Sequence, residues 1–175
     1  MTPLPTNEAS AWLRQHLTGL AAGAYVLDVA AGYGRNTRWL AAQGFHVEAV
    51  DIDATACIGL SKLANVEALC ADLESDPWPY GEHRFDAVVV CRYLHRPLFP
   101  SLLSSIKPGG LLIYETFMRG QELLGRPQNP DFLLEPDELR QLVTPGFEVL
   151  AFEQGLFKQQ TPVMMQRICA RKQAG

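Results

Sequence analysis

The sequence predicts an α/β fold in which strands alternate with helices around a mostly parallel sheet. Short apolar runs bounded by turn residues alternate with segments whose apolar side chains recur every three or four positions. The first apolar run, residues 25–29, leads through a glycine-rich turn directly into a helical pattern, the arrangement that receives anionic ligands at a helix N-terminus. No repeat or linker interrupts the alternation, so a single domain over residues 1–175 is expected.

Seven apolar runs have the length and composition of strands. They occupy residues 25–29, 47–50, 66–71, 85–91, 111–117, 147–152 and 163–170. Helical patterns occupy residues 9–20, 35–43, 55–63 and 98–106, and a further short helix begins near Pro136. The first of these helices belongs to an N-terminal segment, residues 1–22. Residues 74–84, rich in proline and polar side chains, are expected to form a loop, and residues 118–134 a longer one.

The turn after the first strand can bring a ligand against bare backbone. Asp28 lies in that strand, and the turn carries Gly32 and Gly34. Asp51 follows the second strand, where a carboxylate can bind both hydroxyls of a ribose. A dinucleotide fingerprint requires a third small residue, but Thr37 occupies that position. The turn therefore predicts an adenosine-containing cofactor other than a dinucleotide.

The spacing acid-x-small-x-Gly-x-Gly resembles the first motif of class I S-adenosylmethionine-dependent methyltransferases. Four later segments resemble that family in the same order: VDID at residues 50–53, CADLE at 70–74, FDAVVVCRYLH at 85–95 and IKPGGLLIYETF at 106–117. The resemblance covers nearly the whole chain. The tripeptide GRN after the turn is similar to the branch containing tellurite-resistance and small-molecule methyltransferases.

The resemblance implies a Rossmann-like seven-stranded methyltransferase sheet whose last strand is antiparallel. It also implies S-adenosyl-L-methionine as cofactor and S-adenosyl-L-homocysteine as product. The cofactor-binding residues carried over are Asp28, Ala30, Gly32, Gly34, Asp51, Ile52, Asp72, Leu73 and Cys91. Ala30 stands where the family usually has glycine, and we expect a small residue to be tolerated there.

The family's reaction is an in-line displacement in which an acceptor lone pair attacks the methyl carbon on sulfur. Because the cofactor motifs occupy the first three strand ends, the acceptor is expected beyond the fourth and fifth. The catalytic candidates there are His95 and Glu115, and the substrate-binding candidates are Arg92, Tyr93, Arg119 and Arg126. Arginines suit an anionic group of the acceptor. An oxygen acceptor needs a base, whereas a soft acceptor such as sulfur, selenium or tellurium needs none.

Composition favours an enzyme acting on a small molecule. Fifteen basic and nineteen acidic residues give a net charge of −4 and a pI near 5.5, without the basic run typical of nucleic-acid binders. No apolar stretch approaches the roughly 18 residues of a membrane span. The four cysteines lack CxxC spacing and the histidines are scattered, so no metal site is expected. We expect a bacterial cytoplasmic protein, a monomer or homodimer.

Two other functions remain open at this point. The first is an RNA or protein methyltransferase, which a three-dimensional basic patch would favour; its candidates are Arg14, Arg35, Arg92, Arg96 and Arg119. The second is a non-catalytic S-adenosylmethionine-binding module, expected if His95 and Glu115 point away from an open pocket. His95 as a lone histidine also has a purely structural reading, and residues 118–129 have the alternative reading of a surface linker.

Overall fold

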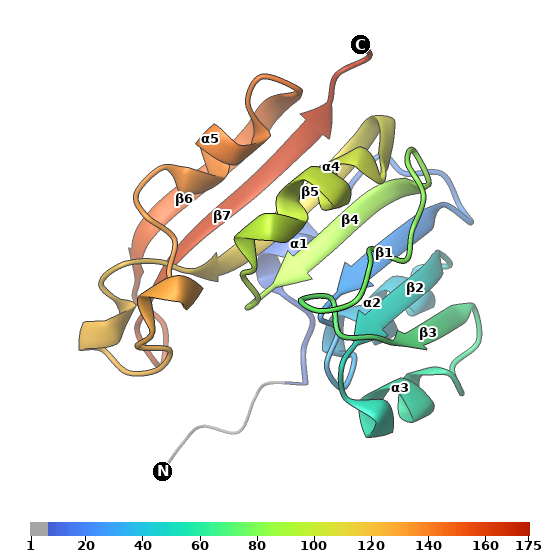
Figure 1. The fold of residues 1–175 in the computed structure, drawn as a ribbon, viewed down its shortest axis with the longest axis horizontal. Helices are drawn as coiled ribbons and strands as arrows, with labels where there is room; N and C mark the ends of the chain where they lie inside the picture. The colour runs from blue at the N-terminus through green and yellow to red at the C-terminus, as the bar shows by residue number, and fades with distance from the viewer. Residues whose placement is uncertain (1–6) are drawn as a thin grey trace.

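The computed structural model describes residues 7–175, whose seven strands form one sheet in the order β3-β2-β1-β4-β5-β7-β6 (Figure 1). The strands are β1 (Tyr25–Val29), β2 (His46–Asp51), β3 (Val66–Cys70), β4 (Phe85–Cys91), β5 (Ile106–Phe117), β6 (Phe147–Phe157) and β7 (Val163–Lys172). Strands β1 to β5 are parallel to one another, whereas β7 lies antiparallel between β5 and β6. The predicted fold, including its antiparallel last strand, is confirmed.

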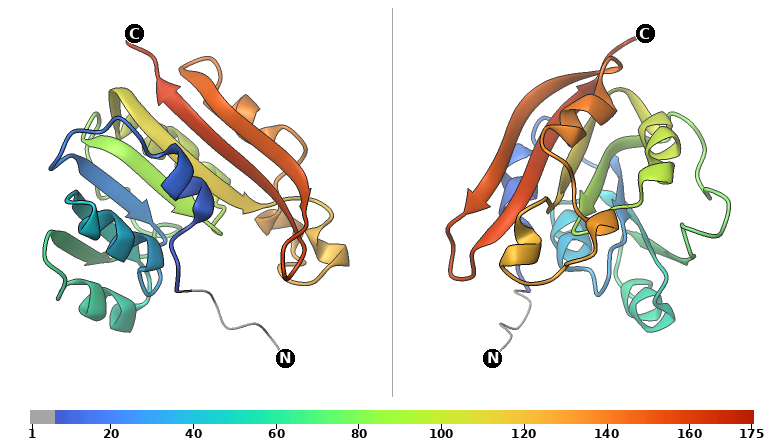
Figure 2. Two further views of the ribbon diagram at one scale, coloured as in Figure 1. Left: turned by 180° about the vertical axis from the view of Figure 1, so that it is seen from behind. Right: turned by 60° about the vertical axis from the view of Figure 1, so that its left-hand side comes forward.

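Helices cover both faces of this sheet (Figure 2). They are α1 (Ala11–His16), α2 (Arg35–Ala42), α3 (Ala54–Leu60), α4 (Phe99–Ser104) and α5 (Glu138–Val143), with the short 3-10 turns η1 (Arg96–Leu98), η2 (Gln121–Leu123) and η3 (Pro130–Phe132). Apolar residues of α1, α2 and α3 belong to one buried cluster, and those of α4 and α5 to a second cluster on the other side.

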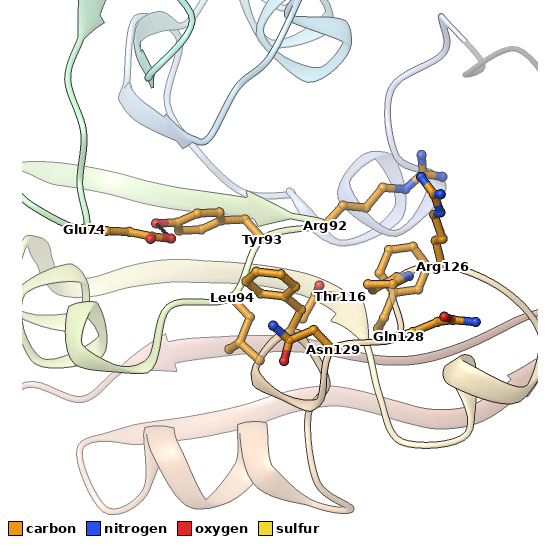
Figure 3. A pocket seen from close by; sticks show the side chains of 11 residues that line it. Glu74, Arg92, Tyr93, Leu94, Thr116, Arg126, Gln128 and Asn129 are labelled. Atoms are coloured by element: carbon orange, nitrogen blue, oxygen red, sulfur yellow. Dashed lines mark hydrogen bonds between the residues drawn. The ribbon is translucent and has the colours of Figure 1, made fainter.

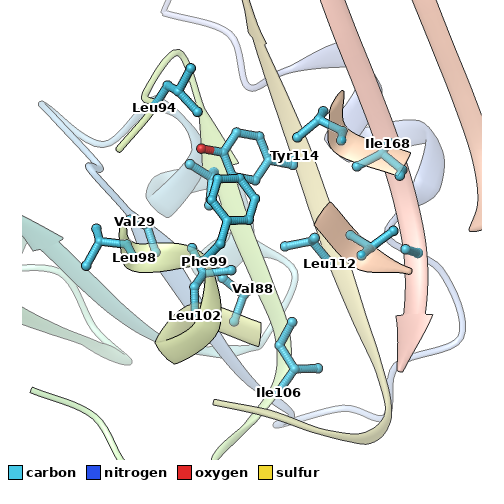
Figure 4. Packing of buried hydrophobic residues seen from close by; sticks show 14 of the residues in the cluster. Val29, Val88, Leu94, Leu98, Phe99, Leu102, Ile106, Leu112, Tyr114 and Ile168 are labelled. Atoms are coloured by element: carbon cyan, nitrogen blue, oxygen red, sulfur yellow. The ribbon is translucent and has the colours of Figure 1, made fainter. Parts of the chain in front are cut away.

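The second cluster anchors the segment that follows β4 (Figure 4). Phe99 of α4 stacks on Tyr114 of β5, with ring centroids 5.3 Å apart and planes within 15°. The Tyr114 hydroxyl donates a hydrogen bond of 2.6 Å to the backbone carbonyl of Tyr93. Because Tyr114 is almost completely buried, this bond fixes the chain at the carboxyl edge of the sheet to the core.

Several element boundaries differ from the expectation. Helix α1 has only six residues, and residues 1–6 of the expected N-terminal segment lie outside the described residues. Ile106, expected on a helical face, begins β5, because this strand already pairs with β4 ahead of a register shift. Gly110 makes this approach possible: a Cβ there would lie 2.9 Å from the Asp86 carbonyl oxygen. Residues 74–84 form a loop without a helix, as expected.

The described part of the chain gives three further facts that bear on function. Within residues 7–175, no helix has both the length and the apolar character needed to cross a membrane. All four cysteines are free thiols. The same residues hold no cluster of three or more side chains suited to binding a metal ion.

Candidate active site

Three hollows lie along the carboxyl edge of the sheet. The largest, of about 700 Å³, lies beyond β4 and β5 beneath the loop of residues 118–134. Hollows of about 580 and 270 Å³ flank the turn after β1, and Ala30 lines both of them. Arg92 lines the largest hollow and the second, while Tyr93 lines the largest and the third. The three hollows therefore share walls and form one branched site.

The turn after β1 adopts the left-handed backbone conformation at three places: φ is 54° at Ala30, 57° at Gly32 and 87° at Gly34. A Cβ on Gly32 would meet no atom within 4 Å, so this backbone is open toward the 580 Å³ hollow that it lines. A Cβ on Gly34 would lie 2.1 Å from the Leu60 side chain. Gly32 thus leaves room for a ligand, whereas Gly34 is required for packing α2 against α3.

Asp28 connects the first strand to the helix after the turn. It is 2% exposed, and the Thr37 hydroxyl donates a hydrogen bond of 2.7 Å to its carboxylate. Burial raises the pKa of Asp28 to about 6, against the lowering effect of the Thr37 hydrogen bond. This contact explains why threonine stands at the third fingerprint position. Asp28 also lines the 580 Å³ hollow, where its charge can meet a cationic group.

Asp51 fixes the turn to the end of β2. Its two carboxylate oxygens accept backbone N–H bonds from Gly32, at 2.8 Å, and from Asp53, at 2.9 Å. A carboxylate has about four acceptor sites, so Asp51 keeps capacity for two hydroxyls. With Asp51, the 270 Å³ hollow is lined by four more predicted cofactor residues: Ala30, Ile52, Asp72 and Leu73. Five of the predicted cofactor residues therefore lie together here.

Cys91 closes the floor of the 580 Å³ hollow at the end of β4. Its thiol is buried, and burial raises its pKa far above the usual range, so the thiol stays neutral. A neutral buried thiol is a poor nucleophile. We therefore read Cys91 as a wall of the cofactor side of the site.

The 700 Å³ cavity has mainly apolar walls and a few charged groups (Figure 3). Its apolar lining residues are Leu94, Phe117, Pro127 and Phe132. The predicted substrate residues Arg92, Tyr93 and Arg126 all line it, together with Glu74. The Tyr93 hydroxyl donates a hydrogen bond of 3.4 Å to Glu74. The loop of residues 118–134 thus helps enclose a cavity.

Three residues expected around the acceptor lie elsewhere. Arg119 pairs with Glu135 at 2.8 Å and does not line the cavity. The ring of His95 also lies outside the lining, with Nδ1 3.9 Å from Glu74. Glu115 is buried against the opposite face of the sheet. The structure therefore does not bring these three side chains into the lining of the 700 Å³ cavity.

Strand alternation explains the position of Glu115. Side chains of consecutive residues in a strand point to opposite faces, and Tyr114 packs in the cluster on the α4 side. Glu115 therefore points to the α1 side, where the Ser10 hydroxyl donates a hydrogen bond to it. Its second oxygen lies 3.1 Å from Arg167 Nε in an ion pair. The carboxylate is thus occupied by the protein itself.

Glu74, Asn36 and Gln121 are among the polar residues in or beside the site that were not identified from the sequence. Glu74 lines both the 700 and the 270 Å³ hollows, and its position directly after Leu73 was an available signal. Asn36 lines the 580 Å³ hollow and accepts a 2.9 Å bond from the Ser10 amide. Gln121 holds the loop of residues 118–134. Nothing in the local sequence distinguishes this glutamine from others in the chain.

Comparison with known proteins supports the motif reading. Residues 26–110 match a family model described as a methyltransferase domain. A demethylmenaquinone methyltransferase from Clavibacter sepedonicus is 36% identical over 101 residues, covering 53% of this chain and 40% of that protein. These similarities support the interpretation of the chain as a class I S-adenosylmethionine-dependent methyltransferase. They likewise support S-adenosylmethionine as its cofactor.

Solved structures show that this chain shares its fold with distant proteins. TehB from Haemophilus influenzae superposes with a TM-score of 0.73 at 17% identity, over 87% of this chain and 58% of that one. An S-adenosylmethionine-dependent methyltransferase from Methanosarcina mazei gives a TM-score of 0.73 at 18% identity, over 96% and 100%. The chain therefore spans less than two thirds of both TehB and the Clavibacter protein.

Proposed function

We propose that this methyltransferase transfers the methyl group of S-adenosylmethionine to a small molecule bound in the 700 Å³ cavity. One observation carries the proposal: this cavity shares Arg92 with the 580 Å³ hollow and Tyr93 with the 270 Å³ hollow. A cofactor spanning the two smaller hollows passes Ala30, which lines both. An acceptor in the largest cavity then lies beside the middle of the cofactor.

The protein's contribution to the reaction is mainly position and exclusion of water. Apolar walls hold the acceptor away from solvent, and fixed geometry favours in-line attack. Glu74 is the carboxylate among the described lining residues, and Tyr93 orients it by a hydrogen bond. For an oxygen acceptor, Glu74 is the base that takes the proton from the acceptor hydroxyl. A sulfur, selenium or tellurium acceptor requires no base.

Two further features support a small acceptor. The Clavibacter relative is named for methylation of demethylmenaquinone, which is a small molecule. The chain carries a net charge of −4, which disfavours a polyanionic partner such as RNA. We place the reaction in the bacterial cytoplasm, an environment that keeps free thiols such as the four here reduced.

The proposal is tested with radiolabelled S-adenosylmethionine. Purified protein is incubated separately with a metabolite extract, total RNA and denatured cell protein, after calorimetry has shown binding of S-adenosylhomocysteine. We expect label only in the metabolite fraction. Label in RNA or protein would favour the macromolecular reading, and binding without any transfer would favour a module without catalysis.

A matched pair of variants assigns the transfer to the cavity. Gln128 lies exposed on the cavity wall, so Gln128→Trp is expected to fill part of the cavity and reduce transfer while cofactor binding stays unchanged. Gln141 is exposed on α5 and lines none of the three hollows. Gln141→Trp should therefore leave both properties unchanged. Equal transfer by the two variants would remove the cavity from the reaction.

A further inference from the structure

Two arginines lie at one end of the 700 Å³ cavity without a carboxylate to neutralise them. Within residues 7–175, the side chains of Arg92 and Arg126 make neither an ion pair nor a hydrogen bond. Figure 3 shows both side chains on the side of the cavity away from Glu74. Arg96 and Arg119, by contrast, each pair with a glutamate.

The positive charge of this pair is reinforced by a third arginine. Arg35 lines the adjoining 580 Å³ hollow. Partial burial and the charge of Arg35 lower the pKa of Arg92 against the raising effect of Glu115, which is itself paired with Arg167, and the guanidinium remains protonated at neutral pH. Like charges held together repel each other, and an anion between them removes that repulsion. The cavity end therefore has the electrostatic character of an anion site.

The backbone of Arg92 is held in an unfavourable conformation. Its φ is 55°, in the left-handed region that costs a non-glycine residue of the order of 1 kcal/mol. The Arg92 amide donates a hydrogen bond of 2.9 Å to the Glu115 carbonyl, which ties the strained residue to β5. Strain of this kind persists where surrounding contacts impose it, and it is frequent at ligand sites. Here it directs the guanidinium into the cavity.

Arg126 is held in place by a buried glutamine. The Gln121 side chain donates to the Arg126 carbonyl at 3.0 Å and accepts from the Met164 amide of β7 at 2.9 Å. The two ends of the loop are joined where the Leu134 amide donates to the Phe117 carbonyl at 3.0 Å. Arg126 is therefore part of a built loop, anchored to the sheet at two places.

The rest of the cavity suits an apolar group. Leu94, Phe117, Pro127 and Phe132 provide its walls, and Phe132 is 48% exposed although it is a large aromatic side chain. A volume of about 700 Å³ is in the range of cavities that bind drug-sized molecules. The cavity thus offers an apolar compartment and, at one end, two free guanidinium groups.

We propose that the acceptor is an amphipathic small molecule whose oxyanion is bound by Arg92 and Arg126 and whose apolar part fills the cavity. A carboxylate, sulfonate or phosphate presents the paired oxygens that a guanidinium binds with two parallel hydrogen bonds. The inference rests on the proposed function only in calling this molecule the methyl acceptor. Binding of such a molecule follows from the cavity itself, whether or not a methyl group is transferred.

The carboxylate of the cofactor does not account for this pair of arginines. Arg35 lines the 580 Å³ hollow and is available to a carboxylate bound there. Arg126 lines only the 700 Å³ cavity and is absent from both cofactor hollows. An oxyanion that contacts Arg126 therefore belongs to the molecule in the larger cavity.

Two fluorescent probes test the inference directly. 8-Anilinonaphthalene-1-sulfonate has an apolar body with one sulfonate, and N-phenyl-1-naphthylamine has the same body without it. Both are titrated into the full chain in the presence of saturating S-adenosylhomocysteine. We expect the sulfonate to bind roughly tenfold or more tightly than the neutral probe, the effect of a hydrogen bond to a charged group. Equal affinity of the two probes would overturn the inference.

Two variants test whether the sulfonate group of the probe is bound by Arg126. Arg126→Gln should weaken sulfonate binding roughly tenfold and leave the neutral probe unchanged. Arg119→Gln, in the same loop but paired with Glu135 outside the cavity, is the matched control and should change neither. Unchanged sulfonate binding in Arg126→Gln would refute the assignment. A thermal melt identical to that of the parent chain excludes a loss caused by unfolding.

The outcome also separates this inference from the proposed function. If methyl transfer occurs but Arg126→Gln has no effect on the charged probe, the acceptor class is wrong and the reaction stands. If the charged probe depends on Arg126 but no fraction accepts a methyl group, the cavity binds oxyanions and the transfer proposal fails. Phosphate- and carboxylate-bearing naphthalenes, titrated in the same way, distinguish which oxyanion the pair prefers.

Discussion

The carboxyl edge of the sheet has two halves, a cofactor half over β1 to β3 and an acceptor half over β4, β5 and the loop of residues 118–134. Three charged side chains of the first half have partners within the protein, whereas two of those in the second half have none within residues 7–175. Over β1 to β3, three carboxylates are already bonded by the chain itself: Asp28 by a hydroxyl, and Asp51 and Asp72 by backbone amides. Over β4 and β5, the guanidinium groups of Arg92 and Arg126 have no partner among the described residues. The first half is organised before any ligand arrives, whereas the second presents charge for a ligand to neutralise.

This difference follows from how each half is built. The cofactor half consists of strand ends and one short turn, so its groups are fixed by contacts between neighbouring strands. The acceptor half depends on a loop, residues 118–134, that returns to β5 and β7 through a few backbone bonds. A common cofactor and a variable acceptor can be served in this way by one fold.

The largest expected effect tests whether Gly34 serves mainly the stability of the fold and Gly32 mainly the binding of the cofactor. Gly34→Ala places a Cβ 2.1 Å from Leu60 at a φ of 87°, and we expect it to lower the free energy of unfolding by about 3 kcal/mol. Gly32→Ala meets open space at a φ of 57°, so it should cost only about 1 kcal/mol. Urea denaturation measures both values.

For cofactor binding we expect the opposite order, in which a substitution at Gly32 has a larger effect than one at Gly34. Because Gly32 lines the 580 Å³ hollow with open backbone, Gly32→Val is expected to abolish binding of S-adenosylhomocysteine in a folded protein. Combining Gly34→Ala with Leu60→Ala should cost less than the sum of the single changes, since the clash is removed. Strong binding by folded Gly32→Val would show that the cofactor does not lie on this turn.

The next effect concerns the organised carboxylates. Asp51→Ala removes two acceptors for ribose hydroxyls, and we expect the affinity for S-adenosylhomocysteine to fall by about 2 to 3 kcal/mol. Asp53→Ala, two residues on, is the matched control. Asp53 caps α3 through the Ala56 amide at 3.1 Å, so its loss should cost about 1 kcal/mol of stability and no affinity. Calorimetry showing equal affinities for the two variants would contradict the role of Asp51.

Glu115, which lies near the end of β5 but points away from the 700 Å³ cavity, is predicted to contribute to stability. Glu115→Gln leaves Arg167 without its buried counter-charge, and we expect the free energy of unfolding to fall by about 2 kcal/mol. Glu153 approaches the same arginine at 3.9 Å but is exposed, so Glu153→Gln should change stability by less than about 0.5 kcal/mol. Cofactor affinity should be unchanged in both. A large loss of turnover in stable Glu115→Gln would restore a catalytic role.

The residues that the sequence predicts for the cofactor all line the 580 or the 270 Å³ hollow, because their signals are local. The acid, the glycines and the strand-end residues Asp51 and Ile52 are spaced along short strands whose neighbours are fixed by parallel pairing. The alternation of strands and helices predicted the α/β sheet, and the family resemblance implied its antiparallel last strand. Gly34 also lines the 580 Å³ hollow, but its close approach to Leu60 could not be predicted, because that side chain belongs to another helix.

The acceptor half was harder to predict because its geometry is non-local. Position at a strand end suggested Glu115, but strand alternation turns it toward Ser10 and Arg167, which are distant in sequence. Arg119 and Arg126 looked equivalent in the loop, yet only the fold brings Glu135 beside the first. Which charged group finds a partner depends on tertiary contacts that local spacing does not encode.

The pH dependence of the free energy of unfolding tests the charge of Asp28. Its pKa is about 6 in the folded protein against 3.8 for a free carboxyl group, so between these values the folded state binds more protons than the unfolded state. Stability therefore falls as pH rises through this window, by up to about 3 kcal/mol. Asp28→Asn cannot ionise and should become the more stable protein above pH of about 6. Parallel urea curves at both ends of the window measure the difference.

The same titration should appear in cofactor binding. If the ionised Asp28 attracts the ammonium group of the cofactor, affinity for S-adenosylhomocysteine rises with pH through about 6 in the parent chain, where this pKa lies. Asp28→Asn should bind weakly with no such rise. A rise that persists in the variant would assign the titration to another group.

The smallest expected effect is that of His95, and it tests the boundary of the acceptor half. His95 lies outside the cavity lining, and its one charged neighbour, Glu74, is 3.9 Å away. We therefore expect His95→Ala to change kcat and the affinity for S-adenosylhomocysteine by less than about threefold, the weight of an exposed ion pair. Tyr93→Phe removes the hydroxyl that orients Glu74 from inside the cavity and should lower kcat more. A tenfold loss of kcat in His95→Ala would mean that the ring enters the cavity when both ligands are bound.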